Sequence, residues 1–429
     1  MNANHATAVQ GRSATNWSLI GLMVLLGLPA GVLRLLHMSG GGVHLGPGLE
    51  VLVFGVGIIS AAFLIAWAAE AAQKDISQTL ALAFLAFIAV LPEYSVDLYL
   101  AWQAGQDPTG PYVHYATANM TGANRLLVGF GWPLVALLFW LKQRRSVYFE
   151  RGIAPEILFL GIATVYALII PFKGNIALYD GVFLIALFGV YIWLAGKTER
   201  LEPELIGPAA TVGNLSVKRR RTALVLMFGF AATVILASAE PFAEGLLNLG
   251  TSAGIDQFLM IQWVAPLASE TPEILVAVIF AVRGQAAAAM TTLISAKVNQ
   301  WTLLVGTLPF VYSLSLGDAT GLPLDPRQAE EVWLTAGQSL FAVAILMNRT
   351  LGLYSSLALA VLWGSQLGVA GATARWGYVG GYLGLAVFLM AVDRNRRRSA
   401  GRLVPDVLSI WRTSKEAGHS GTEEPKKVQ

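Results

Sequence analysis

Cysteine is absent from this sequence and charge is scarce. None of the 429 residues is cysteine, 13% are charged and 55% are hydrophobic, whereas an ordinary soluble domain carries about 25% charged residues. A chain without cysteine forms no disulfide, no thiolate metal site and no cysteine nucleophile. The sequence also has no phosphate-binding loop, no Ser-His-Asp arrangement and no metalloprotease helix. It therefore predicts a protein that is not an enzyme.

Long apolar runs dominate what remains. They recur at about 20 residues each, the length of a helix that crosses a bilayer. A membrane barrel would show short alternating strands instead, and helices and closed barrels are the only backbones that satisfy their hydrogen bonds in lipid. We therefore predict an all-α polytopic membrane protein with about 12 transmembrane helices. The expected spans are 17–37, 49–72, 79–104, 112–140, 156–172, 177–196, 222–249, 256–282, 286–316, 331–348, 352–370 and 376–392.

The distribution of lysine and arginine predicts the orientation. With the amino terminus in the cytoplasm, 23 of the 29 basic residues lie on the inner side and four on the outer side, while Arg125 and Lys297 fall inside spans. Basic residues favour the cytoplasmic side. We therefore expect a protein of the cell (inner) membrane with both termini in the cytoplasm. The expected segments are an amino-terminal stretch (1–16), a first membrane half (17–196), a linker (197–221), a second half (222–392) and a basic tail (393–429). We expect the tail to be mostly disordered and to anchor the last helix rather than bind nucleic acid.

Two apolar spans contain a Pro-Glu pair. The first copy reads "AFIAVLPEYSVDLYLAWQAG" and the second "ASETPEILVAVIFAVRG", which places Glu93 and Glu273 180 residues apart. The first copy enters its span from the cytoplasm and the second from outside, so the repeats (about 79–140 and 256–316) are inverted. Inverted repeats with interrupted helices are typical of secondary transporters, which bind substrate near the midplane.

The proline in each pair exposes an oxygen beside the acid. Proline lacks an N–H and opens the helix, so Pro92 frees the carbonyl of Ile88 and Pro272 that of Ala268. A free carbonyl beside a carboxylate offers the hard oxygens that sodium and calcium prefer.

Each glutamate has a second acid on its helix face. Asp97 follows Glu93 by four residues, and Glu270 precedes Glu273 by three. A charge at the bilayer centre costs about 2.5–3.5 kcal/mol, which a bound cation or proton offsets. The pattern therefore predicts a cation site.

At these residues the sequence resembles the sodium/calcium exchanger family, within the cation/calcium antiporter superfamily. That family carries two inverted alpha repeats, each with a Pro-Glu core, a glycine turn and a "GN-x-x-G-S-N" segment. The resemblance covers roughly residues 50–196 and 222–370 and leaves one helix at each end outside a ten-helix core. It implies a secondary-active cation antiporter in the bilayer that works by alternating access without a cofactor. The transported inorganic cations are sodium, calcium or protons.

The resemblance also implies roles for individual residues. The cation-binding and metal-ligating glutamates fall on Glu93 and Glu273, the asparagines on Asn119 and Asn124, and a polar residue before Pro-Glu on Ser269. In the second repeat the asparagine positions hold Thr292 and Lys297, and the glycine between them is Ser295. Asp97 and Glu270 are additional acids, so the expected cation-binding set is Glu93, Glu273, Asn119, Asn124, Asp97, Glu270, Ser269 and Thr292, with Lys297 modulating the site.

Lys297 is the largest departure from the family. An ammonium has three donors and no acceptor, so it cannot ligate a metal. We hypothesise that it fills a cation subsite and pairs with Glu273 or Glu270. It could instead snorkel to an interface, and a sodium/proton exchanger without calcium transport stays open as an alternative. Glu240 and Glu244 we interpret as structural or mouth-lining.

Overall fold

The computed structural model describes residues 3–40, 45–75, 91–195, 205–367 and 371–420, with residues 3–14 and 412–420 described through their backbone only. The first half contains α1 (Ala3–Met38), α2 (Pro47–Ala72), α4 (Leu91–Gln106), α5 (Tyr112–Leu126), α6 (Trp132–Gln143), α7 (Ala154–Ala167) and α8 (Leu178–Ala195). The second half contains α9 (Gly207–Gly213), α10 (Val217–Ala253), α11 (Gln257–Leu259), α12 (Ala265–Val282), α13 (Ala286–Asn299), α14 (Val305–Leu316), α15 (Pro326–Leu346), α16 (Leu353–Gln366), α17 (Ala372–Val392) and α18 (Arg394–Ser420).

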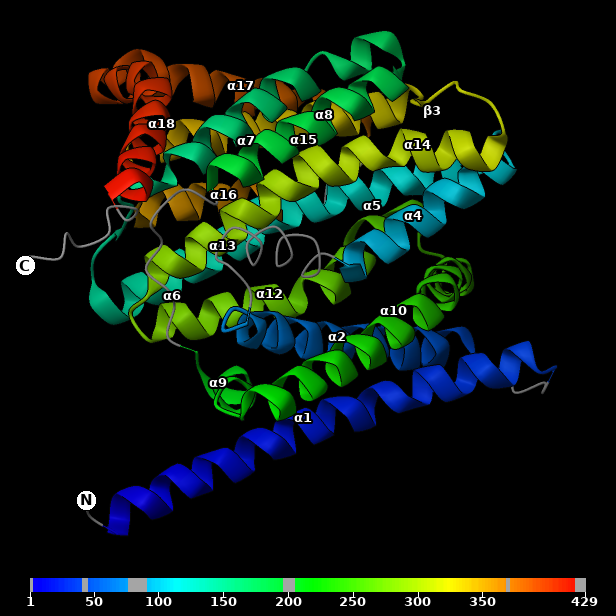
Figure 1. The fold of residues 1–429 in the computed structure, drawn as a ribbon. Helices are drawn as coiled ribbons and strands as arrows, with labels where there is room; N and C mark the ends of the chain where they lie inside the picture. The colour runs from blue at the N-terminus through cyan, green and yellow to red at the C-terminus, as the bar shows by residue number, and fades with distance from the viewer. Residues whose placement is uncertain (1–2, 41–44, 76–90, 196–204, 368–370, 421–429) are drawn as a thin grey trace, which may run out of the picture.

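The helices form one bundle with a layer at its side. The helices α1, α2 and α10 pack together along one flank, and the other helices stack above them (Figure 1). Two short antiparallel ladders join loops at opposite ends of the bundle. In one, β1 (Val147–Tyr148) pairs with β4 (Thr350–Leu351), and in the other β2 (Asn175–Ile176) pairs with β3 (Leu322–Pro323).

The predicted fold class is confirmed. Eleven of the twelve expected spans coincide with helical segments, and the third, 79–104, is described only from Leu91 onward. Within the described residues, eight helical segments are long and apolar enough to cross a membrane. Four expected spans lie outside this group, and three of them, which contain α4, α13 and α15, carry the buried ionisable residues Glu93, Lys297 and Glu331.

The helices of the two repeats run in opposite directions. The start of α5 lies beside the start of the second repeat, where the Tyr115 hydroxyl donates to Gln257 Oε1 at 2.6 Å. At the other end of the bundle, Lys142 near the end of α6 donates to the carbonyl of Val282 at the end of α12. The segment α5–α6, which is the second span of its repeat, thus runs in the same direction as α12, which is the first span of its own. Corresponding spans of the two repeats therefore run in opposite directions, as an inverted repeat requires.

Three expected spans continue through π-helical segments rather than breaking. These segments are Leu127–Gly131 between α5 and α6, Met260–Val264 before α12, and Gln300–Leu304 between α13 and α14. The helix α12 runs through Pro272 without a break, so this proline does not open the helix as expected. Missing one N–H is tolerated because neighbouring helices hold the segment. The carbonyl of Ile88, the counterpart in the first repeat, lies outside the described residues.

Two further features of the sequence are settled by the structure. A glycine between Asn119 and Asn124 could be expected to bend the helix, but α5 is helical through Gly122 and the π-helical segment begins only at Leu127. The basic tail is not mostly disordered, because α18 is helical over Arg394–Ser420. Its arginine-rich start is a good helix former, and its apolar residues Leu403 and Val407 are buried against the bundle.

Gly122 serves instead to bring two backbones together. A Cβ at this position would lie 1.8 Å from the backbone oxygen of Gln262, which is a direct overlap of atoms. We predict that Gly122→Ala lowers the free energy of unfolding by about 3 kcal/mol or more, because the obstruction is backbone and cannot rotate away. Gly189→Ala is the matched control, since nothing lies within 4 Å of its added Cβ. Thermal unfolding of both variants in the same detergent tests this, and equal melting temperatures would contradict the close approach.

Candidate cation site

Carboxylates of the two repeats meet around one glutamine. Gln300 Nε2 donates to Glu93 Oε2 at 2.8 Å and to Glu270 Oε1 at 2.7 Å. All three side chains are buried. Glu93 comes from α4 in the first repeat and Glu270 from α12 in the second, so a single amide group links the two Pro-Glu helices.

Several oxygens around this link have no hydrogen-bond partner among the described residues. They are Glu93 Oε1, Glu270 Oε2, Glu273 Oε2, both carboxylate oxygens of Asp97, and Asn119 Oδ1. Asp97 is fully buried beside the Asn119 side chain, and Glu273 is half-buried. Burying a carboxylate oxygen without a donor is costly, so this arrangement favours a cation or a proton at the acids.

Lys297 makes a second contact between the repeats, in addition to the contact through Gln300. Its ammonium donates to Asn124 Oδ1 at 2.6 Å and to the Asn124 backbone oxygen at 3.2 Å. It also lies 4.6 Å from the centre of the Trp301 ring, which suits a cation. The side chain is fully buried, so it does not snorkel to an interface. Its hydrogen-bond partners within the described chain are oxygens of Asn124, rather than Glu273 or Glu270 as expected.

The structure does not bring every expected residue to these contacts. Thr292 is exposed and its hydroxyl donates to the backbone oxygen of Ala288 on its own helix. Ser269 is buried but donates to the carbonyl of Pro266 at 3.2 Å. Ser295 accepts a hydrogen bond of 2.9 Å from the hydroxyl of Tyr191 on α8.

Two polar residues at the contact were not predicted from the sequence. One is Gln300, and the other is Asn299, whose Oδ1 accepts a 2.9 Å hydrogen bond from the Tyr94 hydroxyl across the repeats. The sequence does contain a signal for Asn299. It follows Glu273 by 26 residues, and Asn119 follows Glu93 by the same interval. Placing Thr292 opposite Asn119 requires about seven extra residues in the outer loop of the first repeat, and this placement passes over the match.

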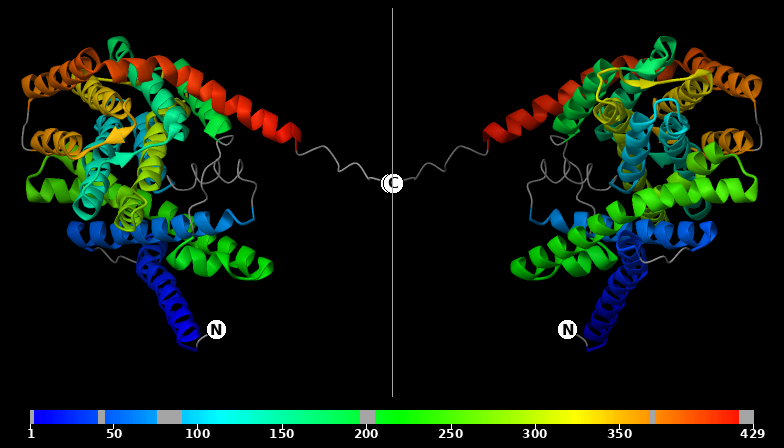
Figure 2. Two further views of the ribbon diagram at one scale, coloured as in Figure 1. Left: turned by 90° about the vertical axis from the view of Figure 1, so that its left-hand side faces the viewer. Right: turned by 90° about the vertical axis from the view of Figure 1, so that its right-hand side faces the viewer.

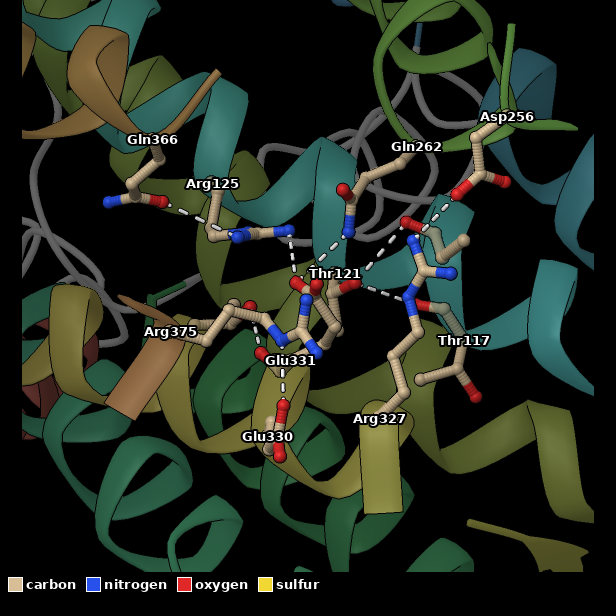
Figure 3. Close-up of polar contacts among 12 residues, drawn as sticks. Thr117, Thr121, Arg125, Asp256, Gln262, Arg327, Glu330, Glu331, Gln366 and Arg375 are labelled. Atoms are coloured by element: carbon tan, nitrogen blue, oxygen red, sulfur yellow. Dashed lines mark hydrogen bonds and ion pairs between the residues drawn. The ribbon is translucent and has the colours of Figure 1, made fainter. Parts of the chain in front are cut away.

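A separate ion pair lies beside Asn124. Arg125 Nη2 is 2.6 Å from Glu331 Oε2, and the Gln262 amide donates to the same oxygen at 3.0 Å (Figure 3). The guanidinium carbon also lies 4.9 Å from the Trp263 ring centre. Both charged side chains are almost completely buried. Arg125 is therefore neutralised by a carboxylate from α15, whereas the hydrogen bonds of Lys297 go to neutral groups.

The two other acids singled out in the sequence lie apart from this contact, toward the far end of α10. Glu240 pairs with Arg34 of α1. Glu244 accepts hydrogen bonds from the hydroxyls of Tyr99, at 2.7 Å, and Tyr112. These contacts tie α10 to α1, α4 and α5, which agrees with a structural role.

Chemically, the cluster offers carboxylate and amide oxygens without thiolate or imidazole. Such oxygens are the ligands of hard cations such as calcium. Within the described residues, no three His, Cys, Asp or Glu side chains converge in the arrangement of a preformed metal centre. Asparagine and carboxylate oxygens that hold a transported ion must also release it, and multiple weak contacts serve that purpose.

Comparison with known proteins defines the class. The family model described as sodium/calcium exchanger protein matches residues 47–197 and 223–371, and the chain belongs to this family. It is therefore an integral membrane transporter of cations by antiport, not an enzyme, and it needs no cofactor.

Solved structures agree with the family. A crystal structure of the H+/Ca2+ exchanger CAX shares 42% sequence identity and superposes with a TM-score of 0.86, covering 94% of this chain and 98% of that one. The native structure of YfkE shares 14% identity with a TM-score of 0.59, covering 85% and 99%. The sodium-calcium exchanger NCX_Mj shares 14% with a TM-score of 0.52, covering 76% and 99%. A search of the curated proteins gave no significant match.

The link through Gln300 leads to a prediction about stability. Gln300→Leu keeps the approximate size but removes the donor from Glu93 and Glu270, and each buried acceptor left without a donor costs about 1–3 kcal/mol. We expect a clear fall in melting temperature without calcium and a smaller fall with calcium present, because the ion offsets the lost donor. Gln285→Leu, at an exposed position, is the matched control. A melting temperature unchanged from wild type in both conditions would show that the link does not hold the helices.

Proposed function

We propose that this protein exchanges calcium for protons across the membrane by alternating access, with the carboxylates of the two repeats as the ion site. The observation that carries the proposal is the meeting of Glu93 and Glu270 at Gln300. It supports a single site shared by both repeats, because a movement of one Pro-Glu helix relative to the other changes the distance between the two acids. Calcium as the cargo is supported by the 42% identical relative described as an H+/Ca2+ exchanger.

The acids of the site suit a divalent ion. Glu93, Asp97, Glu270 and Glu273 lie close enough to interact electrostatically, and several of their oxygens lack donors within the described residues. Like charges at short range repel strongly in a low dielectric. Calcium brings two positive charges and accepts six to eight oxygens, whereas protons neutralise the same oxygens one at a time. Competition between the two for one set of oxygens, together with alternating access of the occupied site, couples calcium movement to proton movement.

Protons rather than sodium as the counter-ion are supported by Lys297. Its ammonium donates a hydrogen bond to the side-chain oxygen of Asn124. The family resemblance assigns Asn124 to cation binding. A protonated side chain there takes the place of one monovalent cation and repels another. We infer that Lys297 fills a subsite that a sodium ion would otherwise use. The rival within the same fold is a sodium/proton exchanger that moves no calcium.

The proposed orientation places the protein in the cell (inner) membrane with both termini in the cytoplasm. It rests on the excess of basic residues on that side, 23 against four. The basic segment 142–151 and the start of α10 lie at this end of the bundle.

Flux measurements distinguish the alternatives. Purified protein in liposomes with an acidic interior is expected to accumulate calcium-45, because outward proton movement drives calcium inward. A sodium gradient at equal pH is expected to drive none. Sodium-22 uptake under the proton gradient without calcium uptake would establish the sodium/proton rival, and calcium entry without any counter-gradient would indicate a channel.

The two Pro-Glu acids are predicted to be indispensable. Glu93→Gln and Glu273→Gln should each reduce calcium-45 uptake by at least about 100-fold, while the proteins still insert and purify. The amide keeps size and one acceptor but loses the charge that offsets the desolvation of the ion. Glu240→Gln is the control, because that acid pairs with Arg34 away from the site, and it should retain uptake. Wild-type rates in both site variants would refute the assignment.

Lys297→Asn is predicted to introduce a response to sodium. It frees Asn124 Oδ1 and removes the ammonium group. Sodium should therefore inhibit calcium uptake or, when a sodium gradient is imposed, drive it, and calcium should bind more tightly. The comparison is calcium uptake with sodium from zero to 100 mM at constant pH, in this variant and in wild type. Lys218→Asn, at an exposed position, is the control. Indifference to sodium in the Lys297 variant, with unchanged calcium affinity, would show that the ammonium does not stand in for a cation.

A further inference from the structure

The carboxy-terminal helix α18 is fixed to one end of the bundle. Asp393, between α17 and α18, accepts a 2.6 Å hydrogen bond from the Asn348 amide. The guanidinium of Arg396 donates to the carbonyl of Ile345 at 2.8 Å at the end of α15, and Arg349 pairs with Asp406. The orientation of α18 relative to the bundle is thus set by polar contacts at its start and near its middle.

The helix runs across the bundle rather than along it. In Figure 1 α18 lies at the end of the bundle where α6 and α12 end, and Figure 2 shows it extending sideways beyond the other helices. It runs across the direction of α5 and α14 (Figures 1 and 2). Because those helices cross the membrane, α18 lies close to the plane of the membrane surface.

Its faces differ in chemistry. Leu403 and Val407 are buried against the bundle, while Val404 and Leu408 beside them are exposed, at 52% and 47% of their maximal accessible area. Residues four apart share a helix face, so the two exposed apolar side chains form a stripe that continues the buried one.

A second stripe consists of arginines. Arg394, Arg398 and Arg402 follow one another at intervals of four and are exposed. None of the three guanidinium groups makes a hydrogen bond or ion pair with the part of the chain that the structure describes. Arg397, by contrast, donates to the carbonyl of Met390 at the end of α17. The arginine stripe is therefore not used to hold α18 in place.

We propose that α18 is an interfacial helix that binds the anionic phospholipids of the leaflet on its side of the membrane. A helix in the membrane plane with an exposed apolar stripe inserts it at the boundary of the acyl chains, and guanidinium groups beside it meet the phosphate headgroups. The span α17 ends at Val392, two residues before Arg394, so the arginine stripe starts at headgroup depth. The surface goes beyond the ion site, and calcium flux neither supports nor contradicts it.

The absence of cysteine allows a direct test. A nitroxide attached to Leu408→Cys in the full chain reports the depth of α18 in nanodiscs through its collision with oxygen, measured by power saturation in electron paramagnetic resonance. We expect the label to be more accessible to oxygen in phosphatidylcholine discs with 30% phosphatidylglycerol than in phosphatidylcholine alone. Each guanidinium near an anionic surface strengthens binding about fivefold.

Two matched triple variants separate the arginine stripe from net charge. Replacing Arg394, Arg398 and Arg402 by glutamine should abolish the response to phosphatidylglycerol. Replacing Arg151, Lys218 and Arg219, which are exposed elsewhere, removes the same charge and should preserve it. Either an unresponsive wild type or a responsive arginine-stripe variant would overturn the proposal. Spin–spin broadening that appears with protein concentration in detergent would overturn it as well, since α18 would then bind a second copy of the chain.

Discussion

The constraint on which the structure depends is the burial of carboxylates inside a membrane bundle. Glu93, Asp97 and Glu270 are all but inaccessible to water, and an acid at the bilayer centre is costly unless it is protonated or paired. Few hydrogen-bond donors within the described residues are available to offset this cost. Gln300 supplies two hydrogen bonds, while Arg125 is committed to Glu331. The remaining oxygens have no donor among the described residues, so in the proposed mechanism the stability of the bundle and the transport of ions rest on the same atoms.

The surrounding fold holds these groups at short range. Gly122 brings α5 against the π-helical segment before α12, and this contact places Asn124 within reach of Lys297 on α13. Both contacts cross between the inverted repeats. Because the Gln300–Glu93 and Lys297–Asn124 hydrogen bonds both join one repeat to the other, we expect a change of occupancy at the acids to act on the relative position of the repeats, which is the movement that alternating access requires.

The sequence predicted the large features because membrane insertion imposes strong patterns. Apolar length located the spans, and the duplicated Pro-Glu located the inverted repeats and their buried acids. Details that depend on side-chain direction were less accessible. Thr292 faces away from the contact although the motif places it there, and the polar pair Asn299–Gln300 was overlooked because a loop insertion shifted the alignment. The helix α18 was missed because its hydrophobic residues are few and their role depends on the bundle beneath them.

The central claim is that one cation site is built from the acids of both repeats, with Lys297 in place of a second cation. Its most direct test is to locate strontium, a calcium substitute with strong anomalous scattering, in crystals of the protein at neutral pH. The account predicts one anomalous peak within ligand distance, about 2.3–2.7 Å, of oxygens from Glu93 and Glu273, with the Lys297 ammonium still on Asn124. A peak bound by Asn124 Oδ1 with Lys297 displaced, or no peak between the two Pro-Glu helices, would contradict it.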